Sequence, residues 1–364
     1  MRLRSSDAAR IAEILGAFSG PKAWYDLSDA ASLRKDSVGN APVGAVGDSI
    51  GMVLDKAYGL VRGPNVWAAP SLGSSWIDNG DGTYTKPAGP NDNMTVPGVL
   101  TIGRTYEVVY TIDSQSGPVS IRPLVGVSSV APIAGKVGIN RFIMTASGDT
   151  TAYINSGVSS GGTVRDISFR EIPGNHATQS SPGSCPIWQG KYGAFDGIDD
   201  SWTTSSIDFS STDKVTVVAG VRKASDANPA IVCEFGPTIA TSNGAFYLSA
   251  PNGGDATFGF AAKGTALSAL TAAAAAPFTA VLSGLYDIGG ASVIGRLNGA
   301  ATSSGATLGS GNFGAYPLNI GRRNNSSLPL SGSLFGMIVI GRLLEVAELA
   351  VFERYMARQA GVSP

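Results

Sequence analysis

The chain has 364 residues, more than one ordinary hydrophobic core accommodates, so its length predicts two domains or one large domain with an insertion. Only 15% of the residues are charged, while 48 are glycine and 20 are proline. This balance favours short strands joined by tight turns and predicts an all-β fold. The formal net charge is −1 and basic residues do not cluster, which argues against nucleic acid as a partner.

The sequence also bounds the compartment. We find no run of about twenty apolar residues that would predict a membrane span, and the N-terminus does not resemble a signal peptide. We therefore expect a soluble protein that is made in the cytoplasm, with no membrane partner. Cys185 and Cys233 belong to no Cys-x-x-Cys pattern, which argues against zinc. Free thiols are expected in a reducing cytoplasm, although one disulfide between them remains open.

The first predicted element is a short helix within residues 1–22. Asp7 can cap it, and Gly20 followed by Pro21 ends it. Its apolar residues recur at helical spacing and are Ala8, Ile11, Ala12, Leu15 and Phe18. This apolar stripe must be buried either by the protein's own domain or by another subunit, so docking and oligomerisation are both open for the helix.

Residues 23–65 show short strand-like segments separated by glycine turns, which predicts the first part of a β-sandwich. Residues 66–173 then form a self-contained series of alternating segments. Their number and spacing are typical of a jelly roll. The expected strands are residues 76–77, 83–85, 105–112, 119–124, 141–144, 151–154 and 164–172.

A second series of strands follows a loop rich in glycine, serine and proline, and with its final helix it makes up residues 174–364. The expected strands are residues 192–195, 214–221, 230–235, 245–248, 257–262, 279–286, 291–297, 318–320 and 334–340. The five alanines at 272–276 precede Pro277 and an alternating strand, so we expect an extended segment or loop there and not a helix. Residues 345–358 have one apolar face and predict a C-terminal helix that Gly361 ends.

Several motifs resemble modules of virion proteins from tailed bacteriophages and prophages. Residues 76–85 with the strand at 164–172 resemble a carbohydrate-binding-module-like jelly roll of such proteins. Four other segments resemble laminin-G or concanavalin-like lectin sandwiches, namely residues 23–29, 194–200, 297–299 and 320–323. The resemblance therefore implies two β-sandwiches of different kinds.

The order of the motifs predicts how the two sandwiches are joined. In the phage group that the chain resembles, a Leu-Asp-Lys element, here residues 54–56, runs directly into Gly-Asn-His-Ala-Thr-Gln, here residues 174–179. In this chain residues 57–173 separate the two elements. We therefore expect the jelly roll, residues 66–173, to be inserted into a lectin-like sandwich built from residues 23–65 and 174–364.

The resemblance implies a non-enzymatic structural protein, located in the virion as a head-decoration, head-fibre, collar or tail-associated protein. Its implied partners are capsid or tail components and further copies of itself in a homo-oligomer. An alternative is an adhesion module that binds glycans of the host surface, and the two functions are compatible. Fold alone does not decide between them.

A polysaccharide depolymerase is the third hypothesis, and it would depend on Glu107 or Glu234. Concanavalin-like glycosidases, by resemblance, place acidic residues at alternating positions of one strand, and this chain lacks such an array. The single histidine, His176, lies in a loop of glycine, serine and threonine, so a hydrolytic triad would depend entirely on it and on non-histidine partners. His176 is interpreted as a turn residue of the family pattern. We therefore expect no enzymatic activity.

Candidate binding residues follow from the chemistry of sugars, which bind to exposed aromatic faces with polar groups beside them. The candidates for glycan binding are Trp76, Tyr84, Trp202, Tyr316, Asn324 and Asn325.

Calcium is the one cofactor that the sequence admits. Asp196, Asp199 and Asp200 surround a glycine turn and offer the oxygen ligands that calcium prefers. A second set could do the same in the jelly roll and consists of Asp78, Asn79, Asp81 and Asp92. For both sets, ordinary hairpin-turn chemistry is the simpler alternative.

Overall fold

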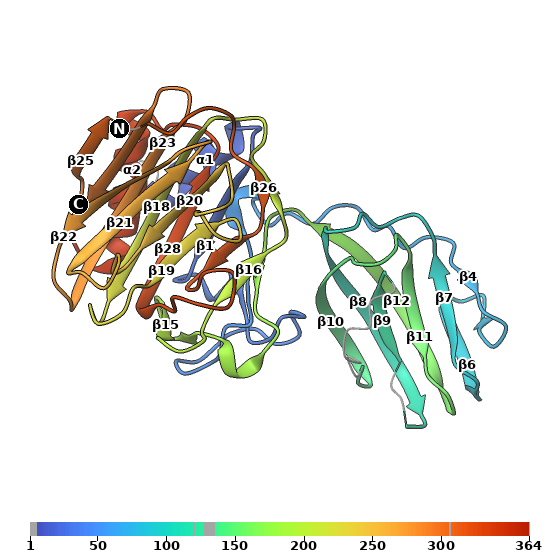
Figure 1. Cartoon of the computed structure of the whole chain (residues 1–364). Helices are drawn as coiled ribbons and strands as arrows, with labels where there is room; N and C mark the ends of the chain where they lie inside the picture. The colour runs from blue at the N-terminus through green and yellow to red at the C-terminus, as the bar shows by residue number, and fades with distance from the viewer. Residues whose placement is uncertain (1–5, 119–120, 127–134, 306, 364) are drawn as a thin grey trace, which may run out of the picture. The chain divides into compact units, whose positions relative to one another are not determined.

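The computed structural model describes residues 6–118, 121–126, 135–305 and 307–363, and it confirms the all-β fold (Figure 1). The described residues contain many strands and two α-helices, α1 (Asp7–Ala17) and α2 (Val346–Ala360). The chain divides into two compact units. Unit 1 comprises Met1–Ser37, Ala41–Gly59 and Gly174–Pro364, and unit 2 comprises Val38–Asn40 and Leu60–Pro173.

The sequence predicted that the second domain begins at residue 66. Unit 2 also contains residues 38–40 and 60–65. The N–H of Gly63 donates to the carbonyl of Glu171 at 2.9 Å, so the chain pairs with a strand of unit 2 before it reaches residue 66. The carbonyl of Val38 likewise accepts the N–H of Ile143 at 2.8 Å. Backbone hydrogen bonds of this kind impose no pattern on the side chains, so they could not be predicted from the sequence.

Unit 1 is a sandwich of two large sheets with a short ribbon. The eight-stranded sheet A runs β14 (Ile187–Trp188), β15 (Gly193–Asp196), β28 (Ser331–Ile340), β18 (Lys214–Lys223), β23 (Phe278–Asp287), β24 (Ser292–Leu297) and β25 (Ala300–Gly305), with β1 (Lys22–Asp26) also on β28. The nine-stranded sheet B runs β2 (Leu33–Arg34), β3 (Met52–Val53), β13 (Ala177–Thr178), β16 (Trp202–Thr204), β27 (Leu318–Ile320), β19 (Ile231–Phe235), β20 (Ala245–Ser249), β21 (Thr257–Lys263) and β22 (Leu267–Ala273). The ribbon pairs β17 (Ile207–Asp208) with β26 (Ala315–Tyr316).

Side chains of sheet A alternate between two cores. On β18, Val215 and Val217 point into the core between the sheets, while Val218 belongs to a second cluster on the outer face. That second cluster includes residues of both helices, so α1 and α2 cover the outer face of sheet A. Three short 3₁₀ turns complete the unit, η1 (Ala30–Ser32), η2 (Lys56–Tyr58) and η3 (Pro182–Ser184).

One face of helix α1 is buried within unit 1. Ile11 and Leu15 are fully buried in the cluster that contains Phe352 of α2. The cap differs from the prediction, because the Ser6 hydroxyl accepts the N–H of Ala9 at 3.3 Å, while the carboxylate of Asp7 pairs with arginines of α2. Of the two alternatives for the apolar stripe, the structure shows burial by the protein's own domain.

Helix α2 is fixed at both ends. A capping box joins Glu345 and Glu348 at its start, and Arg342 contacts Glu348 through two hydrogen bonds of 2.7 and 2.8 Å. Gly361 ends the helix with φ of 71°, in the left-handed region that favours glycine. The predicted helix at 345–358 is therefore confirmed, with its end two residues later at Ala360.

The two ends of the chain segment that builds unit 2 are held together inside unit 1. The carboxylate of Asp55, which is fully buried, accepts the N–H groups of Trp24, Ala57 and Asn175 at 2.7, 2.9 and 2.8 Å. The N–H of Asp55 in turn donates to Nδ1 of His176 at 2.9 Å. His176 is therefore a buried partner of the backbone and not the simple turn residue that the sequence suggested.

Unit 2 is a sandwich of two antiparallel sheets. The five-stranded sheet C runs β10 (Gly138–Thr145), β8 (Thr105–Ser116), β12 (Ser160–Ile172), β6 (Thr83–Gly89) and β5 (Ile77–Asp78). The four-stranded sheet D runs β4 (Ser71–Leu72), β7 (Asp92–Val96), β11 (Ala152–Ser156) and β9 (Arg122–Val125). The strand predicted at 119–124 begins outside the described residues, and β7 was not predicted.

The remaining fold predictions have mixed outcomes. The alanine run contains no helix: its first two alanines end β22 and the other three lie in the loop before β23, as expected from the proline that follows. Cys185 and Cys233 are both buried free thiols. Among the described residues, neither helix is long and apolar enough to cross a membrane.

Candidate functional site

The six predicted glycan-binding residues are scattered over both units, and two of them lie in cores. Trp202 is 1% exposed in the core of unit 1 and donates its indole N–H to the carbonyl of Ile50 at 2.6 Å. Trp76 is 5% exposed in the core of unit 2. Neither ring can present a face to a sugar, so the expectation of an exposed ring was wrong for both, because large aromatic side chains supply most of the core of a sandwich.

Tyr84 and Tyr316 are half-buried and lie in different units. Tyr84 is on β6 of unit 2 and packs against its core. Tyr316 is on β26 of unit 1, where its hydroxyl donates to the carbonyl of Asn243 at 3.0 Å and its ring meets that of Phe235 edge-on. Tyr316 is therefore a packing residue with an engaged hydroxyl.

Asn324 and Asn325 are exposed in the loop between β27 and β28, and both have positive φ, of 45° and 53°. Asparagine tolerates this left-handed conformation better than most residues. The Oδ1 of Asn325 accepts a hydrogen bond from the hydroxyl of Ser201 at 2.5 Å. This contact places Asn325 next to the acidic turn, where the predicted calcium residues lie.

The acidic turn, defined here as residues 196–200, joins β15 to β16. Gly197 has φ of 79°, which lets the chain reverse, and Oδ1 of Asp196 accepts the N–H groups of Ile198 and Asp199 at 2.7 and 3.3 Å. The N–H of Asp196 donates to Oδ2 of Asp200 at 2.9 Å. These hydrogen bonds are those of an ordinary hairpin turn, which is the simpler alternative to a metal site.

The same turn also gathers three carboxylates in one place. Ligand oxygens of Asp196, Asp199 and Asp200 all lie within 4.8 Å of one another. One oxygen of Asp199 accepts the hydroxyl of Ser184 at 2.7 Å, which orients its carboxylate. A hard cation such as calcium takes oxygen ligands of this kind, so these residues could hold one. The second set does not form a comparable group among the described residues: Asp78, Asp81 and Asp92 each accept hydrogen bonds from nearby backbone N–H groups.

The electrostatics of the turn disfavour three negative charges without a counter-ion. Asp200 is 5% exposed, and burial raises its pKa to about 6. The backbone N–H of Asp196 acts to lower the pKa of Asp200, while the charges of Asp196 and Asp199 raise it further. A bound cation would remove this repulsion.

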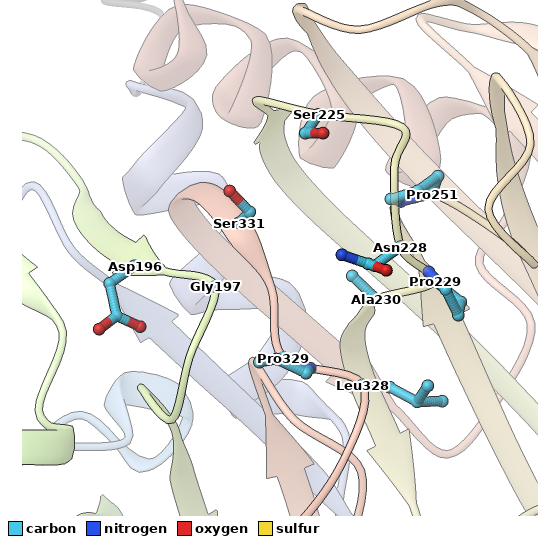
Figure 2. A pocket seen from close by; sticks show the side chains of 10 residues that line it. All are labelled: Asp196, Gly197, Ser225, Asn228, Pro229, Ala230, Pro251, Leu328, Pro329 and Ser331. Atoms are coloured by element: carbon cyan, nitrogen blue, oxygen red, sulfur yellow. The ribbon is translucent and has the colours of Figure 1, made fainter.

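An open pocket of about 400 Å³ adjoins the acidic turn. Figure 2 shows Asp196 and Gly197 on one side of it and Asn228, Pro229 and Pro251 on the other. Ser225, Ala230, Leu328, Pro329 and Ser331 complete the lining. The pocket therefore combines apolar proline and leucine surfaces with hydroxyl, amide and carboxylate groups.

Only one wall of this pocket contains a residue that was predicted from the sequence. Asp196 was predicted from its acidic neighbours. Asn228 and Pro229 lie in a loop between β18 and β19, and Pro329 lies in the loop that follows Asn325. Nothing in their local sequence distinguishes them from ordinary turn residues, and only the packing of distant loops brings them together.

The two glutamates on which a depolymerase would depend are held in ion pairs. Glu107 contacts Arg62 and Arg141, each at 3.0 Å. Burial acts to raise the pKa of Glu107, but the hydrogen bonds and charges of Arg62 and Arg141 outweigh it and hold the pKa below its ordinary value. Glu234 is fully buried, pairs with Arg323 at 2.7 Å and accepts the N–H of Ile239 at 2.7 Å.

Neither a protein-family model nor a curated protein matches the chain. Solved structures with partial similarity include the CBM40 of the Ruminococcus gnavus IT-sialidase bound to α2,3 sialyllactose, at 17% identity and a TM-score of 0.32 over 42% of this chain and 94% of that one. A heptameric SAP-like pentraxin of Limulus polyphemus matches at 11% identity and a TM-score of 0.32, over 44% and 78%. The Trypanosoma rangeli sialidase with the inhibitor DANA matches at 11% and 0.36, over 53% and 31%. These TM-scores are below 0.5, and no conclusion about this chain rests on them.

We predict that Glu107 stabilises unit 2 as an ion-pair partner. Replacing it in Glu107→Gln should lower the free energy of unfolding by about 1–2 kcal/mol at pH 7. Because the folded-state pKa of Glu107 lies below the ordinary 4.5, the loss should be constant above about pH 5 and vanish as the pH falls through the folded-state pKa. Denaturant titrations of both proteins between pH 3 and pH 8 measure this, and a pH-independent difference would contradict it.

We predict that calcium binds the acidic turn. Calcium at a hundredfold excess over its dissociation constant should stabilise the protein by about 2.7 kcal/mol, seen as a higher midpoint of thermal unfolding. Asp200→Asn should abolish this response, while its amide oxygen can still accept the N–H of Asp196. Without calcium the variant should be at least as stable as the wild type at pH 8, since a buried charge is gone. A variant that keeps the full calcium response would contradict the assignment.

Proposed function

We propose that the chain is a non-enzymatic protein that binds carbohydrate in the pocket beside the acidic turn of unit 1. The observation that carries the proposal is the lining of this pocket. Pro229, Pro251 and Pro329 supply apolar surface, while Asp196 and Asn228 supply polar groups. Sugars combine apolar C–H faces with hydroxyl edges, so this mixed lining suits them.

The size and openness of the pocket support the same proposal. Its volume of about 400 Å³ lies within the usual range of about 300–1,000 Å³ for small-ligand sites. Because Asp196 belongs both to the acidic turn and to the pocket wall, a cation held by the turn would lie next to a bound sugar. Hydroxyl groups of a sugar are neutral oxygen ligands that calcium accepts.

The absence of enzymatic activity remains part of the proposal. It is supported by the ion pairs of the two glutamates, since Glu107 pairs with Arg62 and Glu234 pairs with Arg323. A general acid needs a raised pKa, and that of Glu107 is lowered. We therefore expect the protein to bind saccharides without cleaving them.

A glycan array tests the proposal. The wild-type chain should bind a subset of neutral glycans in calcium and lose that binding when EDTA removes the metal. Asp200→Asn should also lose it, because the cation site is incomplete. Asp208→Asn is the matched control and should bind like the wild type, since Asp208 is an exposed residue at the end of β17 in unit 1 that accepts the N–H of Ser210. No binding of any neutral glycan by the wild type in calcium would contradict the proposal.

A second candidate function is that of a homo-oligomeric structural protein of a tailed-phage virion, made in the host cytoplasm and attached to capsid or tail components. The motif resemblance suggests it, and one observation favours assembly. Strand β22 ends sheet B, and among the residues that the structure describes it pairs with β21 alone. It contains no charged residue or proline. Exposed edge strands usually carry charges or prolines that prevent pairing with other chains, so an uncharged edge suits contact with another copy.

The edge of sheet B gives a testable prediction for this second function. Leu267, Ala269 and Thr271 are exposed on β22, and Ala269→Lys places a charge in the middle of the strand. Light scattering should show an oligomer for the wild type and a smaller species for the variant. Ala31→Lys, at an exposed alanine of η1, should leave the mass unchanged. A monomeric wild type would rule out assembly of the isolated chain through this edge.

A further inference from the structure

The outer face of sheet D in unit 2 carries an ordered array of polar side chains. The register places Asn93 of β7 opposite Asn155 of β11, and Asn155 opposite Arg122 of β9. The next row on the same face contains Thr95, Tyr153 and Leu124. Neighbouring residues of these strands, including Met94 and Ile154, are buried in the core of unit 2. Because side chains alternate along a strand, the two rows point away from that core.

Asn155 is the centre of this array. It is 3% exposed although it points away from the core, because other polar side chains surround it. Its Nδ2 donates to Oδ1 of Asn91 at 2.9 Å and to Oδ1 of Asn93 at 2.8 Å. Its Oδ1 accepts Nε of Arg122 at 3.0 Å. All four side chains are therefore held in one hydrogen-bonded network.

The network leaves mainly donors free for a ligand. Since Oδ1 of Asn91 and of Asn93 each accept from Asn155, the remaining group on each of these side chains is an NH₂. Neither NH₂ is among the buried unpaired atoms, and within the described residues neither has a protein partner, so both are open to solvent. Arg122 uses Nε for Asn155, which leaves its two terminal nitrogens without a partner in the described part of the chain.

The acidic side chains near this face are already engaged. Asp149 accepts the hydroxyl of Tyr153 at 2.7 Å and the N–H of Thr151 at 2.8 Å. Asp92 accepts the N–H groups of Ser75 and Asn93 at 2.6 and 2.9 Å. No carboxylate forms an ion pair with Arg122 among the described residues, so its charge is uncompensated.

Tyr153 supplies the apolar element beside these donors. It is half-buried on β11, two residues from Asn155 on the same face, and its bond to Asp149 fixes the ring. An aromatic ring that is fixed in this way offers a flat surface at little cost in conformational entropy. The face thus combines an aromatic surface, a free guanidinium group and two amide donors.

We propose that this face of sheet D binds a carboxylated saccharide. The terminal nitrogens of Arg122 would bind the carboxylate through two parallel hydrogen bonds, the NH₂ groups of Asn91 and Asn93 would donate to ring or hydroxyl oxygens, and Tyr153 would contact the apolar face of the sugar. This site goes beyond the pocket of unit 1 and does not depend on calcium. Uronic acids and sialic acids share the required chemistry.

Isothermal titration of the full chain in EDTA tests the proposal, because EDTA removes any contribution of calcium in unit 1. The probes are trigalacturonate and sialyllactose, which carry carboxylates, and maltotriose, which is neutral. At least one carboxylated probe should bind at least tenfold more tightly than maltotriose. The carboxylated probe that binds more tightly shows whether the site prefers a uronic acid or a sialic acid. Equal affinity for maltotriose, or no binding of either carboxylated probe, would overturn the proposal.

Variants separate this site from the pocket of unit 1. Arg122→Gln should weaken binding of the carboxylated probe by at least tenfold, and Tyr153→Ala by a similar factor. Arg122→Lys guards against a folding defect. It should show a smaller loss than Arg122→Gln because the charge remains, but still a loss because a lysine cannot bind a carboxylate through two parallel hydrogen bonds. Arg170→Gln, at an exposed arginine of sheet C, and Asp200→Asn in unit 1 should both bind like the wild type. Unchanged affinity in Arg122→Gln would contradict the site even if the glycan array shows calcium-dependent binding.

Discussion

The architecture depends on the buried carboxylate of Asp55. The chain leaves unit 1 after Gly59 and returns at Gly174, and Asp55 accepts backbone N–H groups from both sides of that excursion. A fully buried carboxylate is costly unless it is hydrogen-bonded, and three N–H donors satisfy this one. The hydrogen bond from the N–H of Asp55 to His176 closes the same junction from the other direction.

The contacts around Asp55 give a structural role to three of the sequence motifs on which the resemblance rests. Lys56 pairs with Asp26 at 2.8 Å and with Asp29 at 2.6 Å, and it lies over the ring of Trp24. The hydroxyl of Tyr25 donates to the carbonyl of Asn175 at 2.6 Å. Residues 24–26, 54–56 and 174–176 are thus joined by one set of contacts within unit 1. A large insertion is tolerated where its two ends lie close together.

Strand periodicity made much of the fold predictable. The long strands β18, β23 and β28 alternate in hydrophobicity or are apolar throughout, and each was predicted to within a few residues. Strand β22 lies at a sheet edge, where most of its side chains are exposed or half-buried and little burial imposes a pattern. It was therefore predicted only as extended chain at its alanines. The cap of α1 was misplaced by one residue, because Ser6 and Asp7 are both good capping residues and only the hydrogen bond to Ser6 distinguishes them.

The candidate sites were predictable only where local sequence supplies several ligands. The acidic turn was found because Asp196, Asp199 and Asp200 are adjacent in the chain. The opposite wall of the pocket, and the Asn93–Asn155–Arg122 row of sheet D, come from strands and loops that are far apart in sequence. For aromatic residues the prediction was wrong where a predicted ligand residue is a core residue. Composition does not separate a core tryptophan such as Trp202 from one on a binding surface.

Hydrogen exchange of the full chain in calcium, measured with and without the neutral glycan that binds most strongly on an array, tests the central claim most directly. Binding in the pocket of unit 1 should slow exchange of backbone amides in residues 193–201, 225–230 and 321–331, because these segments line the pocket or form the acidic turn. Protection in all three segments is the predicted result. Glycan binding that leaves the three segments unchanged would contradict the claim that this pocket is the binding site.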